Sequence, residues 1–139
     1  MAEALFTSWL AKQGQQEEWR VASAGVEAYP GIPATQKARM VMAERGIDME
    51  SHRSQAVSPE LLESCSMVLV MEEWHQRRLQ LAHPSHARKI HPIRRLAGLK
   101  GAVEDPVGLS LTAYRQTADE LQMLLERIFQ NRVLPDPGG

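Results

Sequence analysis

Few residues of this 139-residue chain have the type and spacing to do chemistry. Cys65, the only cysteine, could supply a nucleophilic thiolate. It lies just before the apolar run Met67 to Met71, where a free cysteine is most often a small buried side chain. No serine, histidine and acid arrangement stands out in the sequence. We therefore interpret Cys65 as a core residue at the entrance of a strand.

Metal chemistry finds little support in the sequence. Four of the five histidines lie in the second half of the chain: His75, His83, His86 and His91. They lack the i, i+4 pairing with a third ligand that a zinc site needs, so we predict no metal and no cofactor. Arg77–Arg78 and Arg94–Arg95 are short basic doublets, which are more often solvated surface than a phosphate site.

Composition restricts the class of protein. A 139-residue chain with 43% hydrophobic residues can bury one core, so we predict a single α/β domain over residues 1–133 and a frayed tail over 134–139. Sixteen basic and 17 acidic residues, mixed along the chain, predict no nucleic-acid or membrane partner. A single cysteine and no signal peptide or spanning segment favour a cytoplasmic protein.

The elements that must position these side chains follow from periodicity and turn residues. Predicted helices cover Met1–Gln13, Thr35–Arg45, Ser58–Leu62, Glu72–Ala82 and Ser110–Ile128. Predicted strands cover Glu18–Ser23, Met67–Met71 and Lys89–Ile93, and Leu96 to Gly108 is expected to be irregular. The unbroken apolar run at 67–71 indicates a strand buried on both faces, and Pro92 places the last strand near an edge. Alternating helices and strands favour a doubly wound α/β sheet.

A set of short segments, spread over nearly all of the chain, carries a resemblance. They are Met1–Phe6, Ser23–Gly25, Pro33–Thr35 with Ala38, Gly46–Asp48, His52–Arg53, Val68–Met71, and Asp105–Pro106 with Tyr114. In order and spacing they resemble the low-molecular-weight protein tyrosine phosphatases. The stretch from Asp105 to Glu120 looks closest to the bacterial branch that includes protein arginine phosphatases.

The resemblance implies a three-layer, flavodoxin-like parallel sheet of about three to four strands flanked by helices. In this family a C-x5-R-S-P loop, preceded by the first strand, comes immediately before a segment like Met1–Phe6. We therefore expect the family's first strand and phosphate loop to be missing here. Cys65 does not open a second such loop, because residue 71 is methionine.

The resemblance also assigns roles to three residues. The aspartate of the Asp-Pro step, here Asp105, is the family's general acid, although Asp-Pro alone is ordinary turn chemistry. Tyr29 and Val107 lie where the family places the walls of the substrate cleft. Val107 departs from the aromatic residue that is usual after the Asp-Pro step.

These expectations leave several readings of function. The intact family hydrolyses phosphoprotein monoesters through a cysteinyl-phosphate, but we expect this chain to be inactive without the nucleophile, as a truncated tyrosine or arginine phosphatase. The alternative is a natural pseudophosphatase that binds a phosphoprotein or a partner chain. A thioredoxin-coupled arsenate reductase would need more cysteines than Cys65. Loss of an interior strand would expose strand edges, which predicts a homodimer or a rearranged edge.

Overall fold

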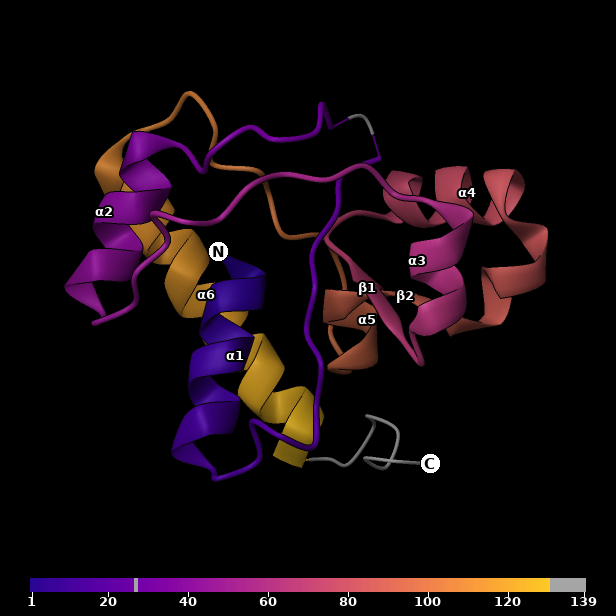
Figure 1. Ribbon diagram of the computed structural model, residues 1–139, viewed down its shortest axis with the longest axis horizontal. Coiled ribbons are helices and arrows are strands. Elements are labelled where there is room, and N and C mark those ends of the chain that lie inside the picture. The colour runs from indigo at the N-terminus through magenta and orange to yellow at the C-terminus, as the bar shows by residue number, and fades with distance from the viewer. Residues whose placement is uncertain (27, 131–139) are drawn as a thin grey trace.

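The computed structural model describes residues 1–26 and 28–130 and shows an α/β fold (Figure 1). Its elements are α1 (Ala2–Lys12), α2 (Gln36–Glu44), α3 (Pro59–Ser64), β1 (Val68–Val70), α4 (Glu73–Ala82), the 3₁₀ helix η1 (Pro84–Lys89), β2 (Ile90–Pro92), α5 (Ile93–Leu96) and α6 (Leu111–Gln130). The predicted tail, residues 134–139, lies outside the described residues.

Strand β1 lies between two layers of helices. It pairs in parallel with β2, with Val68 opposite Ile90 and Val70 opposite Pro92. Leu69 packs against the core formed with α1, α2 and α6, whereas Val68 and Val70 pack with Ile90 and with α4. The predicted α/β class, a parallel sheet flanked by helices on both faces, is therefore confirmed.

Helix α6 supplies the largest share of the main core. Its apolar side chains recur at helical spacing, so one stripe turns inward. The buried members are Tyr114, Ala118, Leu121, Leu124, Leu125 and Ile128. Ser110 begins the helix, and its Oγ accepts a hydrogen bond from the Ala113 amide at 3.2 Å.

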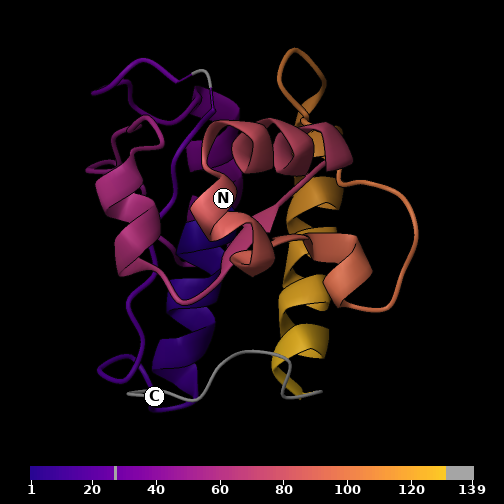
Figure 2. The same cartoon turned by 90° about the vertical axis from the view of Figure 1, so that its right-hand side faces the viewer.

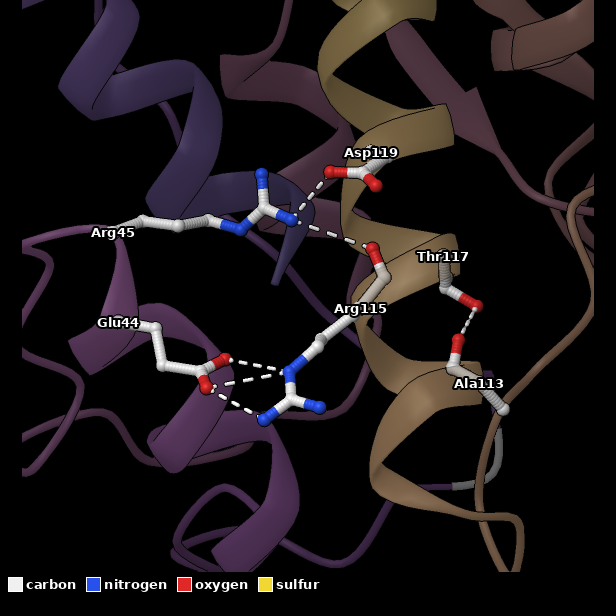
Figure 3. A network of polar contacts seen from close by, with 6 residues as sticks. All are labelled: Glu44, Arg45, Ala113, Arg115, Thr117 and Asp119. Carbon is white, nitrogen blue, oxygen red and sulfur yellow. Dashed lines mark hydrogen bonds and ion pairs between the residues drawn. The ribbon is translucent and has the colours of Figure 1, made fainter.

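Two ion pairs fix α2 against α6 (Figure 3). The Arg115 guanidinium contacts the Glu44 carboxylate at 2.7 Å, and Arg45 contacts Asp119 at 2.5 Å. Arg45 also donates to the Arg115 carbonyl at 3.3 Å. The hydrogen bond from Arg115 lowers the pKa of Glu44 from its ordinary value. These contacts hold the helix that follows residues 28–34 against the helix that follows residues 104–110.

Glycines follow two helices, directly after the predicted helix ends at Gln13 and Arg45. Gly14 has φ 71° after α1, and the Gln15 amide donates to the Leu10 carbonyl at 2.9 Å. After α2, Gly46 has φ 76°, and the Ile47 amide donates to the Met42 carbonyl at 2.9 Å. A left-handed residue followed by such a bond satisfies the last carbonyls of a helix, and glycine adopts it without strain.

The predicted strand over residues 18–23 is wrong. Residues 16–18 form a turn, and residues 19–24 make no ladder in the described part of the chain. A strand needs a hydrogen-bonded neighbour, and backbone pairing begins only at Gly25, whose amide donates to the Gln55 carbonyl at 2.9 Å. The described residues therefore hold a two-stranded sheet, where three to four strands were expected.

Among the helices of the described residues, none is long and apolar enough to cross a bilayer. Among the described residues, no cluster of three side chains could hold a metal ion.

Candidate active site

Asp105 lies in an exposed loop whose shape is set by local hydrogen bonds. Its Oδ1 accepts from the Val107 amide at 3.0 Å, and the Leu109 amide donates to the Pro106 carbonyl at 2.9 Å. Gly108 has φ 82°, as the third residue of such a turn requires. The carboxylate therefore sits on a stiff turn and keeps a second oxygen free of described partners.

Both ends of this loop are attached to the fold. Before it, buried Val103 donates its amide to the Met71 carbonyl, directly after β1, at 3.1 Å. After it, the Leu109 carbonyl accepts from the Lys37 ammonium of α2 at 2.6 Å. In an open parallel sheet the functional edge lies beyond the carboxyl ends of the strands, and Asp105 follows that edge.

Tyr29 lies in a second loop, which is held by Ser54. The Ser54 Oγ donates to the Tyr29 carbonyl at 2.5 Å, and the Ile32 amide donates to the Ser54 Oγ at 2.9 Å. The Tyr29 side chain is 80% exposed and that of Val107 is 62% exposed. Both predicted cleft residues are thus available to a ligand.

A carboxylate joins two of the matching segments at the start of α1. Glu3 Oε2 accepts from the Ser23 hydroxyl at 3.2 Å and lies 3.1 Å from His52 Nδ1. All three residues belong to matching segments of the sequence, but their contact was not predicted. Their wide separation along the chain leaves no local spacing that could reveal the contact.

The start of α1 has no side-chain cap. This differs from α2 and α3, where Thr35 and Ser58 accept a bond from the first turn. The first amides of a helix need partners and favour an anion, so this end is suited to a negatively charged group.

Figure 2 shows how these parts lie relative to one another. Residues 28–34, in purple, and the orange loop over 104–109 lie on opposite sides of the start of α1, toward the same end of the molecule. No hydrogen bond joins the two loops within the described residues. The loop that carries Tyr29 and the loop that carries Asp105 and Val107 thus lie toward one end of the molecule.

Cys65 lies elsewhere. It caps the C-terminal end of α3, and its Sγ lies 3.1 Å from the Leu61 carbonyl. Cys65 precedes β1 whereas the Asp105 loop is tied to Met71 beyond it, and the three residues of β1 alone span roughly 10 Å. The thiol and the carboxylate therefore belong to opposite ends of the strand.

Comparison with known proteins agrees with this arrangement. The sequence profile of the low molecular weight phosphotyrosine protein phosphatases matches residues 1–134. The chain belongs to this family. A protein-arginine-phosphatase of Bacillus subtilis is 36% identical over 129 residues, which cover 92% of this chain and 84% of that protein.

Other members of the phosphatase family are similar to a comparable degree. A probable low molecular weight protein-tyrosine-phosphatase of Ralstonia nicotianae is 30% identical over 102 residues, 73% of this chain and 69% of that one. The crystal structure of a low molecular weight protein tyrosine phosphatase from T. tengcongensis superposes with a TM-score of 0.88 at 37% identity. That match covers 94% of this chain and 88% of the other.

Proposed function

We propose that Tyr29, Asp105 and Val107 form the acid–base and substrate-binding part of a cysteine-dependent protein phosphatase, with Asp105 as its general acid. The observation that carries the proposal is the Asp105 turn. It is attached beyond the carboxyl end of β1 through Val103 and faces the same end of the molecule as the start of α1. Membership in the phosphatase family supports the same role.

The proposed reaction has two steps. A cysteine thiolate attacks phosphorus, and the Asp105 carboxyl protonates the departing oxygen or nitrogen of the substrate. Asp105, now ionised, then takes a proton from the water that hydrolyses the cysteinyl-phosphate. The uncapped start of α1 would lie near the transferred group, whose negative charge suits helix amides.

The nucleophile for this reaction is not among the 139 residues. Cys65 is separated from the Asp105 loop by β1, and no arginine follows it at the sixth position. A positioned acid contributes about 10²–10⁴ in rate, whereas phosphate-monoester hydrolysis calls for accelerations of up to ~10²¹. We therefore propose that a polypeptide of these residues alone is inactive on phosphomonoesters.

The relatives suggest two substrate classes, phosphotyrosine and phosphoarginine. The 36% identical relative is named a protein-arginine-phosphatase, and the T. tengcongensis relative a tyrosine phosphatase. Exposed Val107 offers no flat surface for an aromatic ring to stack on. This observation favours phosphoarginine, whose side chain is not aromatic, as the second candidate substrate.

The first experiment translates, in frame, the DNA that lies upstream of the Met1 codon. If it encodes a strand followed by C-x5-R-S-P, the longer protein should hydrolyse p-nitrophenyl phosphate or phosphoarginine. In that protein Asp105→Asn should lower kcat by about 10²–10⁴. A Glu60→Gln variant, which changes an exposed carboxylate on α3, is the matched control and should retain activity.

The second experiment assays the purified 139-residue polypeptide. We expect no turnover above a Cys65→Ala and Asp105→Ala background. Turnover above it would refute the missing-nucleophile proposal. An upstream sequence without the motif, together with binding of a phosphoprotein but no turnover, would instead support the pseudophosphatase alternative.

We also propose self-association of the 139-residue polypeptide through β1. In the described residues this strand is paired on one side only, with β2, and an unpaired strand edge can accept another chain. Sedimentation should then show a dimer whose fraction rises with concentration. A monomer at every concentration would rule the dimer out.

A further inference from the structure

Charge is unevenly distributed along the chain. Residues 74–103 contain no aspartate or glutamate, but they contain four histidines and seven of the sixteen basic residues: Arg77, Arg78, Arg88, Lys89, Arg94, Arg95 and Lys100. The remaining residues hold nine basic and seventeen acidic side chains. The expectation that both signs are mixed along the whole chain is therefore wrong for this stretch, and the total of -1 conceals the separation.

The acid-free stretch folds into adjoining elements. It forms α4, η1, β2 and α5, which pack on one another on the right side of Figure 1. Several of its cations have partners within the chain, Arg78 among them. Arg94 pairs with Glu120 at 2.6 Å, Arg95 pairs with Glu73, and Lys89 donates to the Cys65 carbonyl at 2.9 Å.

The inner side of α4 is fully engaged with the fold. Leu79 is only 5% exposed and packs with Val70 and Ile90. The amides of Gln76 and Gln80 donate to the carbonyls of residues 90 and 87, at 2.9 and 3.0 Å. The orientation of the helix is therefore fixed, and so is the set of side chains that it turns outward.

The outward set is Trp74, Arg77, Arg78 and Leu81, which we call the α4 face. The four positions follow the i, i+3, i+4, i+7 spacing of one helical stripe. Leu81 is 84% exposed and Trp74 is 41% exposed, although the Trp74 indole N–H donates to Glu72 at 2.7 Å. Arg77 is exposed and makes no hydrogen bond or ion pair with any described residue. Two guanidinium groups thus lie between two exposed apolar side chains.

We propose that the α4 face docks an acidic, amphipathic segment of a partner protein. Guanidinium groups pair well with carboxylates, and tryptophan and arginine are enriched at protein interfaces. Leu81 and Trp74 would cover apolar side chains that flank the partner's carboxylates. Charge complementarity between the two surfaces would chiefly increase the association rate and the specificity of binding.

A nucleic acid fits the α4 face less well. A long polyanion would extend beyond residues 74–103 and meet the rest of the chain, where acidic residues outnumber basic ones by seventeen to nine. A phosphate backbone also gives Leu81 nothing to cover. A short acidic peptide segment avoids both difficulties, because the Debye length of about 8–10 Å confines its interactions to the nearby cations.

The α4 face is separate from the candidate active site. Figure 1 shows α4 at the right of the molecule and the 104–109 loop at the upper left. Docking at α4 therefore needs no contribution from Asp105, and the two proposals can fail independently.

The test measures binding of a labelled helical peptide of about 15 residues that carries glutamates beside leucines on one face. We expect saturable binding at low ionic strength that weakens as salt is raised. Arg77→Gln should weaken it about two- to fivefold, as expected for the loss of one exposed charge pair. Leu81→Ala should weaken it about twofold or more, through lost apolar contact alone.

The matched control is Arg20→Gln, which removes one exposed arginine outside the acid-free stretch. It should leave the affinity unchanged. An equal loss in both arginine variants, or no saturable binding of the glutamate peptide, would overturn the proposal. So would equal binding of a peptide with glutamine in place of glutamate, or tighter Arg77-dependent binding of a single-stranded oligonucleotide.

Discussion

The hydrophobic clusters on the two sides of β1 differ greatly in size. On the side of α1, α2 and α6, the described core cluster contains fourteen buried residues, whereas the cluster on the α4 side contains three, Val70, Leu79 and Ile90. Hydrophobic stabilisation grows with the apolar area removed from water, so most of it comes from the first side. The Asp105 loop belongs to that side, because Val103 at its base is part of the larger cluster. The α4 side contributes less to stability and can present apolar side chains outward.

The largest expected effect on stability concerns the side of β1 with the larger hydrophobic cluster. Leu124 is 0% exposed at the centre of the α6 stripe, so Leu124→Ala leaves a cavity that its many buried neighbours cannot easily fill. The free energy of unfolding should fall by about 3–5 kcal/mol, near the top of the range for such truncations. Urea denaturation followed by far-UV circular dichroism measures it.

The same truncation on the α4 side should cost less. Leu79 is 5% exposed and lies in the cluster of three, where the helix can settle toward the sheet. We expect Leu79→Ala to cost about 2–3 kcal/mol under the same conditions. A loss equal to or larger than that of Leu124→Ala would show that the two sides are energetically alike, and the comparison would fail.

The smallest expected effect on stability concerns the ion pair between Glu44 and Arg115, on the surface of the side with the larger cluster. Arg115 holds the pKa of Glu44 below its ordinary value in the folded chain. The stabilisation is therefore present above the unfolded glutamate pKa and disappears as pH falls through the lower, folded value. Glu44→Gln should shift the denaturation midpoint slightly at neutral pH, and less than either leucine truncation.

At a pH below the lowered, folded pKa of Glu44, the wild-type chain and Glu44→Gln should have the same midpoint. Glu60→Gln, an exposed residue of α3, controls for the loss of one negative charge. A difference between Glu44→Gln and wild type that persists unchanged in acid would mean that the ion pair is not its cause.

Most of the longer helices could be predicted from the sequence. The stripe of α6 and the glycines after α1 and α2 are local signals, and the structure confirms them. The apolar run at 67–71 correctly indicated a strand, although β1 keeps only its three central residues and only Val70 among them is buried, so full burial of both faces was wrong. Helices η1 and α5 were missed because six and four residues are too short to show a period.

Features that depend on contacts between distant segments could not be predicted from the sequence. Residues 18–23 have strand-like composition, but a strand also needs a paired neighbour, and no spacing within the segment reports one. At the candidate site, Asp105, Tyr29 and Val107 came from the family resemblance and remain predictions of role. The meeting of Glu3 with Ser23 and His52 was visible only in the structure.

The separated charges of the chain give it a permanent electric dipole despite a pI of about 6.5. Near that pH the molecule carries almost no net charge, yet it should be retained by cation and anion exchangers alike, each holding the oppositely charged part. Its chromatographic elution will therefore depend on orientation at the resin rather than on the isoelectric point.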